Sequence, residues 1–440
     1  TATDALNARL RAVAASNAAQ KLTPTPTFAD IAATHNLYVR SAYRPFVKIA
    51  SEYTKVAASG SANAGLSAGG TLTFTLPVFG DLTNDLVLHV HVDPIGDRAA
   101  AAAAAVPTAA TPLLRYCAYP GLKILKRVAL MFSQLVIDDY YTDEAVAWGK
   151  SFVGADELAG WNRCLGQQEV QSGAYRANNF TGILNFYDGY QTPKLFHEAL
   201  DLFIPLQFWF CRDPSQAILN ELIANTQRAI ECDVALVGDL ISAYVEGANP
   251  GDLVSSPLPF TRVNASYTLY SDNLYMNHDI RDIFARRVEF TLCRVHMRQK
   301  FGVRAREESR RLDGLKYPGE FLLVGARDKS IVNDPDNWFL MGKAKVRDAF
   351  HALLVPAYVW NGVLAQLVVR TAKPVTSLEP VLESLGVTVR AVKVHPQLPA
   401  PFYGADAPLR YHSRRAEIQA PTDPGQYLSN FCLYPGTDAP

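Results

Sequence analysis

The chain has 440 residues, 49% hydrophobic and 19% charged, a composition typical of globular proteins and unlike that of disordered ones. Lysine plus arginine and aspartate plus glutamate both number 42, so the formal net charge is zero. A protein that coats nucleic acid needs excess basic side chains to neutralise phosphates, so this balance argues against a direct nucleic-acid coat. Zero net charge also provides little long-range repulsion between copies, which permits self-association.

The spacing of the cysteines and the lack of a visible export signal indicate a reducing compartment. The six cysteines are spread along the chain without a C-x-x-C pair. This is typical of free thiols in a reducing compartment. No signal peptide is visible at the start, and no apolar run approaches the roughly 20 residues of a membrane span. We therefore expect a protein that is made and kept in the cytosol.

The first segment, residues 1–27, is predicted to be an N-terminal arm. Leu6, Leu10 and Val13 lie on one face of a short helix, which ends before the prolines of "LTPTPTF". The alternative for this segment is a frayed terminus.

From Phe28 onward, apolar residues recur at every second position in several runs, which predicts β-strands with one buried face. In "TLTFTLPVF" the predicted buried row is Leu72, Phe74, Leu76 and Val78. In "LVLHVHV" it is Leu86, Leu88, Val90 and Val92.

Further strands are predicted at "ILKRVALMF", "RRVEFTLCRVH", "GEFLLVGAR", "YVWNGVLAQLVVRT" and "VTVRAVKV". Clusters rich in Gly, Pro, Asn and Asp separate these runs. Helices are favoured at "GADELAGWNRCLG" and "SQAILNELIANTQ", and the alanine run from Ala99 to Ala105 has high helix propensity between loop segments. Strands joined by long loops predict an all-β protein built from antiparallel sandwiches.

The stretch "ALDLFIPLQFWF" is apolar on both of its predicted faces. Its even positions from Leu200 to Phe210 are all apolar, and the odd positions include Phe203, Pro205 and Trp209. Pro205 cannot donate a ladder hydrogen bond, so it indicates a sheet edge or a bulge. The second apolar row needs a covering layer of its own.

The sequence predicts no catalytic residue, cofactor or metal site. It has no dinucleotide-binding glycine loop, Walker loop, G-x-S-x-G or H-E-x-x-H motif. His89 and His91 share one face of a strand, but no obvious further metal ligand lies nearby in sequence. Asp138 and Asp139 would point to opposite faces of a strand and cannot share a proton. We expect these two carboxylates in a turn before Tyr140.

Long segments in both halves of the chain carry a family resemblance. In the first half they are "AYRPFVKIASEYTKV", "LTFTLPVFGDLTNDLV", "LRYCAYPGLKILKRVALMFSQLVIDDY" and "GADELAGWNRCLGQQE". In the second half they are "YQTPKLFHEALDLFIPLQFWFCRD", "NLYMNHDIRDIFARRVEFTLCRVH", "LKYPGEFLLVGAR" and "DNWFLMG". In this order they resemble the major capsid protein of asfarviruses, the African swine fever virus group, and of related nucleocytoplasmic large DNA viruses.

The resemblance implies a double jelly roll, which is two eight-stranded antiparallel sandwiches in tandem with few short helices in loops. We expect the first jelly roll at residues 28–185 and the second at 186–440. The even row from Leu200 to Phe210 then fills the second sandwich. Phe203 and Trp209 become interface candidates, which face the sister jelly roll, another subunit or a covering loop.

The resemblance also implies the function and the partners. The expected function is that of a non-enzymatic major capsid protein, whose homotrimeric capsomers have a pseudo-hexameric outline and tile the shell of a large icosahedral DNA virus. Expected partners are further copies, minor capsid and penton proteins, and an inner membrane approached by the arm at residues 1–27. No direct contact with nucleic acid is expected, and the protein is expected in the virion after assembly in the host cytoplasm.

The sequence departs from the family at its end. In the family, further strands follow the region that resembles "APTDPGQYLSNFCLYPGTDAP", whereas this sequence stops at Pro440. A sandwich without those strands would expose its core and its sheet edges. We therefore expect either that the second jelly roll lacks its last strands or that another segment fills the gap.

Two other functions are left open by the sequence. Tandem jelly rolls also occur in glycan-processing enzymes and lectins, which would need an acidic and aromatic cleft and a secretory route. A minor capsid or scaffold component would differ mainly in copy number. The mass of the native particle distinguishes a capsid protein from an enzyme or lectin. A capsomer contains three chains, whereas the enzyme or lectin would remain a monomer.

Overall fold

The computed structural model describes residues 49–60, 69–103, 106–154, 156–167, 175–178, 182–185, 190–211, 216–223, 226–247, 253–278, 281, 293–303, 307–313, 317–332, 335, 338–346, 354–361, 366–374, 376–379, 381–389, 391–407 and 425–431. The predicted arm at residues 1–27 lies outside these described residues. Among the helices described, none has both the length and the apolar character needed to cross a membrane.

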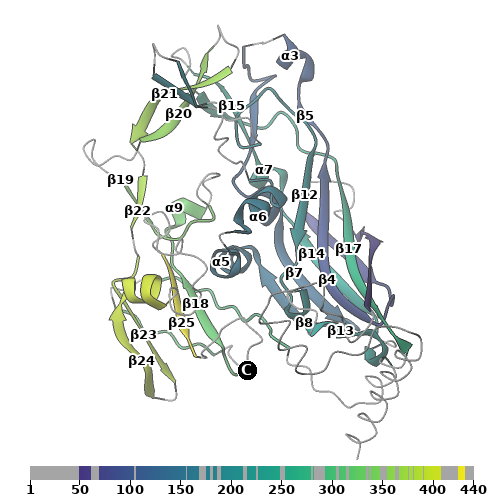
Figure 1. Cartoon of the computed structure of the whole chain (residues 1–440). Helices are drawn as coiled ribbons and strands as arrows, with labels where there is room; N and C mark the ends of the chain where they lie inside the picture. The colour runs from purple at the N-terminus through teal and green to yellow at the C-terminus, as the bar shows by residue number, and fades with distance from the viewer. Residues whose placement is uncertain are drawn as a thin grey trace, which may run out of the picture.

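A sandwich of two antiparallel sheets forms the largest part of the described fold (Figure 1). One sheet has the strand order β1-β17-β4-β12, with the short β13 also paired to β4. Its strands are β1 (Ile49–Ala57), β4 (Leu82–Val92), β12 (Leu200–Pro205), β13 (Ile218–Leu219) and β17 (Ala265–Met276). The other sheet has the order β2-β3-β14-β7-β8. Its strands are β2 (Ser59–Gly60), β3 (Gly70–Leu76), β7 (Leu125–Phe132), β8 (Leu135–Tyr141) and β14 (Arg228–Val234).

Apolar rows from both sheets form one core cluster. Leu72 and Phe74 of β3 and Leu88 of β4 are fully buried, while the threonines of β3 are partly or fully exposed. The alternation predicted for these two runs is confirmed. Val78 is the exception, because β3 ends at Leu76 and the valine that follows is exposed.

Strand β12 belongs to this same sandwich and not to a second one. It pairs antiparallel with β4, Leu202 opposite Val90, and its even residues Leu200, Leu202 and Ile204 lie in the common core. The prediction that this row fills the second sandwich is therefore wrong. Alternation shows that a strand has one buried face, but it does not show which strands cover that face. β14 and β17 also follow residue 186, so the sandwich extends beyond the predicted boundary at 185.

Short helices lie beside the sandwich. They are α3 (Arg98–Ala102), α4 (Pro120–Lys123), α5 (Thr142–Phe152), α6 (Leu158–Cys164), α7 (Val237–Leu240) and α9 (Lys329–Val332). α6 confirms the helix predicted at "GADELAGWNRCLG". The helix predicted at "SQAILNELIANTQ" is wrong, because that segment forms β13 and a 3-10 turn, η5 (Asn220–Ile223).

Helix α5 contacts both the sandwich and the part of the chain that follows Met276, which is called the C-terminal region below. It begins directly after β8, where the Glu144 carboxylate accepts a hydrogen bond from the backbone N–H of Tyr141 at 2.7 Å. Near its other end, Lys150 Nζ donates to the carbonyl of Phe339 at 2.8 Å. α5 and α6 lie between the sandwich and the strands of the C-terminal region (Figure 1).

After Met276, the described strands pair two by two. The pairs are β18 (Phe321–Gly325) with β25 (Gln426–Asn430), β19 (Lys343–Val346) with β22 (Thr376–Glu379), β20 (Leu354–Asn361) with β21 (Gln366–Pro374), and β23 (Ser384–Val389) with β24 (Val392–Pro399). These pairs confirm the strands predicted at "GEFLLVGAR", "YVWNGVLAQLVVRT" and "VTVRAVKV". A small buried cluster of Ala400, Tyr403 and Tyr427 lies next to β25 and a π-helical turn, η6 (Phe402–Asp406).

Short strands complete the described fold. β5 (Ile95–Gly96) pairs with β11 (Phe196–His197), β9 (Tyr175–Asn178) with β10 (Gly182–Asn185), and β15 (Ile241–Glu246) lies between β16 (Leu253–Ser256) and β6 (Leu113–Tyr116). In the run predicted as the strand "RRVEFTLCRVH", the described residues 293–296 are irregular.

Candidate subunit interface

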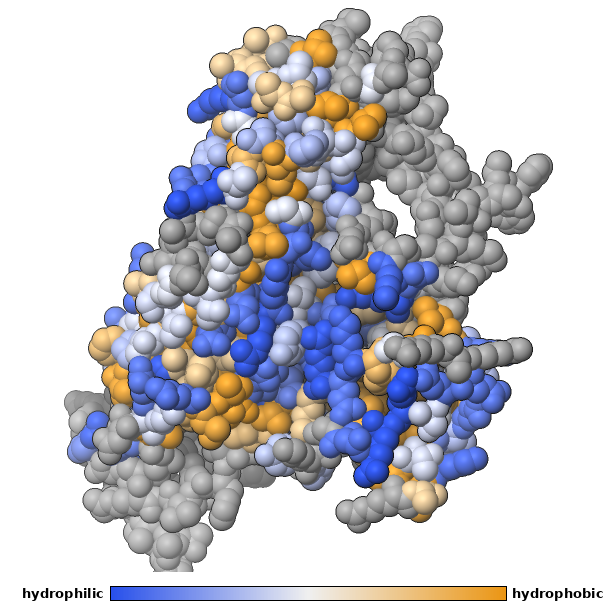
Figure 2. All heavy atoms as spheres, turned by 180° about the vertical axis from the view of Figure 1, so that it is seen from behind, coloured by the Kyte–Doolittle hydropathy of each residue, from blue (hydrophilic) through white to orange (hydrophobic). Residues whose placement is uncertain are grey.

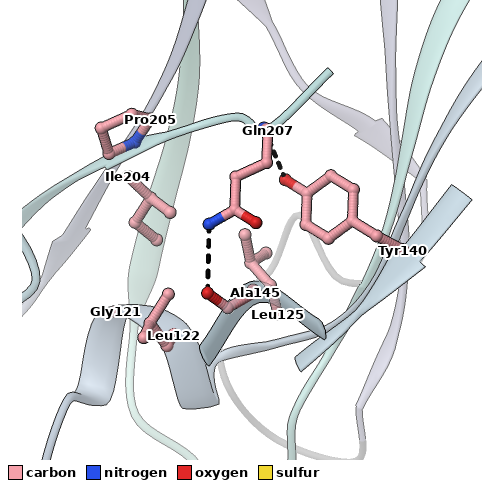
Figure 3. Close-up of a pocket in the computed structure, with 8 residues that line it drawn as sticks. All are labelled: Gly121, Leu122, Leu125, Tyr140, Ala145, Ile204, Pro205 and Gln207. Carbon is pink, nitrogen blue, oxygen red and sulfur yellow. Dashed lines mark hydrogen bonds between the residues drawn. The ribbon is translucent and has the colours of Figure 1, made fainter. Parts of the chain in front are cut away.

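A small cavity lies between β12, β8 and helices α4 and α5 (Figure 3). Gln207 closes it, because its backbone N–H donates to Tyr140 Oη at 3.3 Å and its Nε2 donates to the carbonyl of Ala145 at 3.3 Å. The remaining space is about that of a single water molecule. This cavity is therefore too small for a metabolite or a cofactor.

The face of β4 and β12 that points away from the core carries polar and aromatic side chains. The same alternation that buries the even positions of β4 presents His89 and His91 outward. On β12 it presents Asp201 and Phe203, which lie opposite His91 and His89 in the ladder. These four residues are called the outer-face cluster below.

Both histidines of the outer-face cluster bond to one carboxylate oxygen. Asp201 Oδ1 lies 2.9 Å from His89 Nε2 and 2.8 Å from His91 Nδ1. Hydrogen bonds from His91 and then from His89 hold the pKa of Asp201 below its usual range. The shared face of the two histidines was predictable from their spacing. Their contact with Asp201 was not, because it depends on β12 lying beside β4.

A preformed metal site is not apparent at this cluster. Within the part of the chain that the structure describes, no group of three or more His, Cys, Asp or Glu side chains is arranged to hold a metal ion. Asp201 is hydrogen-bonded to both rings instead of being placed as a third ligand around a common centre.

Phe203 gives the outer-face cluster an exposed apolar surface. Its side chain is 42% exposed, and its ring stacks on His89 with centroids 4.6 Å apart and planes 11° apart. On the other side of His89, the ring of Tyr270 from β17 lies at 6.1 Å, and Lys55 of β1 lies over that ring. A row of rings thus crosses three strands. Aromatic side chains are enriched in the cores of protein interfaces, so Phe203 is a good interface candidate.

Trp209, the other predicted interface residue, lies in the core of its own chain. β12 ends at Pro205 and a 3-10 turn, η3 (Trp209–Cys211), follows, so the alternation of a strand no longer applies. Trp209 is only 4% exposed, and its ring packs edge-on against Phe210 at 5.2 Å. It therefore has almost no surface left to contact another subunit, and its covering layer comes from its own chain.

Asp138 and Asp139 lie on β8, so their expected placement in a turn is wrong. The turn between β7 and β8 comes earlier, at Ser133 and Gln134, which both have positive φ angles. The expectation that the two carboxylates cannot act as a pair is supported. Asp139 forms an ion pair with Arg127 at 2.8 Å, while Asp138 is buried and contacts a different part of the chain.

Asp138 binds the segment that follows the sandwich. It accepts a hydrogen bond from the backbone N–H of His296 at 2.7 Å, and its other oxygen lies 3.0 Å from His296 Nδ1. The ring of Tyr140 lies 5.3 Å from the His296 ring, and burial raises the pKa of Tyr140 well above its usual range. Asp138, Tyr140 and His296 are called the β8 junction below. This junction ties residues 293–300 to the edge of the second sheet.

The surface seen from behind in Figure 2 carries hydrophobic side chains in separate patches. Hydrophilic side chains lie between them over much of this view. A mixed surface of this kind is usual for globular proteins and does not by itself locate an interface.

Comparison with known proteins shows similarity over the whole chain. No family model matches it. The major capsid protein of African swine fever virus, isolate Pig/Kenya/KEN-50/1950, is 22% identical, and the alignment covers 99% of this chain and 88% of the relative. The major capsid protein of Pyramimonas orientalis virus is 28% identical over 38% of this chain and 34% of its own length.

Solved structures show the same similarity in three dimensions. The Faustovirus major capsid protein has a TM-score of 0.70 and 25% identity, and the match covers 100% of this chain and 92% of that chain. The PBCV-1 virus capsid has a TM-score of 0.58 and 17% identity, and the match covers 92% of this chain and 82% of that chain. These neighbours are double jelly rolls, and the predicted fold class is confirmed. The two sheets of the sandwich together contain eight strands of jelly-roll order, β1-β17-β4-β12 in one sheet and β3-β14-β7-β8 in the other.

Proposed function

Since this chain is a homologue of the major capsid proteins of large DNA viruses, we propose that it is itself a major capsid protein and builds the outer shell of a virion. The observation that carries this proposal is the match to the Faustovirus protein over the whole chain. The similarity to the African swine fever virus protein covers nearly the whole chain as well. The two sheets share one buried core, as expected for a rigid building block of a shell.

The two jelly rolls are proposed to divide the chain near Met276. The first contains the two sheets of the sandwich, from β1 to β17, whose apolar rows share one core. The second is proposed to form from residues after β17, which include the paired strands from β18 to β25. This division replaces the predicted one at residues 185 and 186, because β12, β14 and β17 are strands of the first sandwich.

The assembling unit is proposed to be a homotrimer with a pseudo-hexameric outline, because three chains with two jelly rolls each present six similar sandwiches. The formal net charge of zero allows copies to approach one another. The exposed ring of Phe203 offers an apolar contact on the flank of the sandwich. A permanent assembly of this kind is expected to bury roughly 2,000 Å² or more per interface.

Further partners are proposed from the position of such a protein in a shell. Neighbouring capsomers, minor capsid proteins and penton proteins would contact its flanks, and an inner membrane would lie on the side approached by the N-terminal arm. Assembly is proposed to take place in the host cytoplasm. The balanced charge supports a shell without direct contact to nucleic acid.

A structural role is favoured over catalysis. The relatives are named as capsid proteins. A glycan-processing enzyme or a lectin would need a cleft with acidic and aromatic side chains that converge on a sugar.

The mass of the native particle tests the proposal. Purified full-length chain is expected to have the mass of three chains by light scattering after size exclusion, and particles with a hexagonal outline in electron micrographs. A protein that remains monomeric at high concentration would overturn the capsomer.

Phe203→Ser tests the proposed contact against a matched control. This variant is expected to lower the equilibrium constant for trimer formation at least about tenfold, which corresponds to about 1.4 kcal/mol. Leu135→Ser serves as the control, because Leu135 is also exposed but begins β8 in the other sheet of the sandwich, directly after the turn at Ser133 and Gln134. Equal trimer fractions in wild type and Phe203→Ser would place the contact elsewhere on the surface.

A further inference from the structure

The side chain of Trp338, from the C-terminal region, lies in the core of the sandwich. It is only 2% exposed and belongs to the same buried cluster as Leu72 and Phe74. Its indole Nε1 donates to the carbonyl of Ala118 at 2.6 Å, although the two residues are 220 positions apart in the chain. The backbone N–H of Ala118 donates in turn to the carbonyl of Pro335 at 2.9 Å. The later part of the chain therefore completes the core of the earlier part.

Side chains from α4, α5 and the residue before α4 surround this insertion. Lys123 of α4 places its Nζ 4.5 Å from the centre of the Trp338 ring. The next residue, Phe339, packs edge-on against the Tyr119 ring at 4.7 Å, and Lys150 Nζ of α5 lies 5.4 Å from its ring centre. A cation at this distance is attracted by the face of an aromatic ring. Trp338 and Phe339 are called the aromatic anchor below.

Arg327 connects the backbone of the aromatic anchor to α5. Its Nη1 donates to the carbonyl of Trp338 at 2.7 Å, and its Nη2 donates to Asp143 Oδ1 at 2.6 Å. The other oxygen of Asp143 accepts a hydrogen bond from Arg298 Nη2 at 2.8 Å. All three charged side chains are largely buried, and hydrogen bonds between ionised groups are stronger than those between neutral groups. One carboxylate of α5 thus binds two arginines of the C-terminal region.

A third contact to α5 comes from β25. The side chain of Gln426 is buried, and its Nε2 lies 3.3 Å from the carbonyl of Ala147 and 3.1 Å from Ser151 Oγ. Helix α5 lies between the sandwich and strands β18 and β25, where these contacts meet (Figure 1). Among the described residues that follow Met276, Trp338 is the only buried member of the sandwich core cluster. The aromatic anchor is therefore the apolar part of a contact that is otherwise polar.

We propose that the aromatic anchor holds the C-terminal region on the first sandwich, so that both parts of the chain unfold together and keep one orientation in the assembled capsomer. Parts of one chain move relative to one another unless a substantial apolar interface joins them. The orientation in the capsomer rests on the proposed function, because three chains give a pseudo-hexameric outline only if each presents its two jelly rolls in the same way. The joint unfolding rests on contacts within one chain.

The test compares Trp338→Ala with Trp209→Ala in the full chain. Both variants remove a buried indole from the same core cluster, but Trp209 comes from the sandwich itself. Wild type and Trp209→Ala are each expected to unfold in urea in one transition, with the same midpoint by circular dichroism and by tryptophan fluorescence. Trp338→Ala is expected to show two transitions, of which the first belongs to the C-terminal region. Without urea, a protease should cleave this variant after Met276 at least about tenfold faster than wild type, while the sandwich stays intact.

Asp143→Asn gives a second, milder test, which also decides the question if Trp338→Ala does not fold. This variant keeps the aromatic anchor but removes the charge that binds Arg298 and Arg327, so cleavage after Met276 should accelerate by about threefold. Asp139→Asn is the matched control, because Asp139 also pairs with an arginine but does so within the sandwich. Equal cleavage rates for the two variants would overturn the inference.

The outcomes separate this inference from the proposed function. If Trp338→Ala unfolds in one transition and resists the protease as Trp209→Ala does, the aromatic anchor is only a core element and the inference is overturned. Two transitions in wild type would overturn it as well. Trp338→Ala is also expected to lower the equilibrium constant for trimer formation at least about tenfold. An unchanged constant overturns the role in orientation. A monomeric wild type overturns the capsomer, whereas unfolding and proteolysis still test the anchor.

Discussion

The outer-face cluster and the β8 junction contain the same kinds of side chain in different surroundings. Each has a histidine hydrogen-bonded to an aspartate with an aromatic ring beside it. The Asp201 side chain is 49% exposed, whereas that of Asp138 is 0% exposed. Water can replace the partners of Asp201 but not those of Asp138. The same pair of residue types therefore stabilises the fold at one site and remains available for a partner at the other.

Substitution of a buried side chain should lower the free energy of unfolding more than substitution of an outward-facing one. We expect the largest such difference between Trp209 and Phe203. Trp209→Ser removes a core ring and should lower the free energy of unfolding by about 3–5 kcal/mol. Phe203→Ser removes a half-exposed ring and should lower the free energy of unfolding of the isolated subunit by less than about 1 kcal/mol. Urea unfolding of both variants checks this, and equal losses would mean that Phe203 is also covered by its own chain.

The next largest loss of stability is expected when the β8 junction is broken. Asp138→Ala leaves the backbone N–H of His296 without its buried acceptor, so the free energy of unfolding should fall by about 2–4 kcal/mol. The neighbouring Asp139→Ala breaks only a partly exposed ion pair with Arg127 and should cost about 1 kcal/mol or less. Urea midpoints of the two variants give this comparison. A larger loss for Asp139→Ala would reverse the assignment of the two carboxylates.

The smallest effect on stability is expected at Asp201. Because the folded-state pKa of Asp201 is lowered, its contribution to stability is present above the unfolded-state pKa and is lost as the pH falls through the folded-state pKa. Solvent around this carboxylate keeps that contribution small. Asp201→Asn should therefore shift the urea midpoint only slightly at pH 7, and the shift should vanish in strong acid. A large shift at pH 7 would show that the outer-face cluster is structural, like the β8 junction.

Patterns within single strands were predictable from the sequence. The burial of Leu72 and Phe74 and the shared outward face of His89 and His91 follow from the alternation of side chains, which any extended backbone imposes. The double jelly roll came from the resemblance of long colinear segments, since alternation alone indicates a sandwich without its topology. Alternation also predicted that Asp138 and Asp139 point to opposite faces of a strand, whereas the expectation that they lie in a turn was wrong.

Contacts between distant parts of the chain were decided by the tertiary structure. His89 and Asp201 are 112 residues apart, and Asp138 and His296 are 158 residues apart. No local property of either segment specifies which strand lies beside it, because pairing depends on the packing of the whole sheet. The position of Trp209 has the same origin, since the end of β12 at Pro205 and the turn that follows direct its ring into the core. The sequence by itself determined which faces of the strands are apolar, and only the tertiary structure decided what covers each face, since burial is shared between segments that meet only in the folded chain.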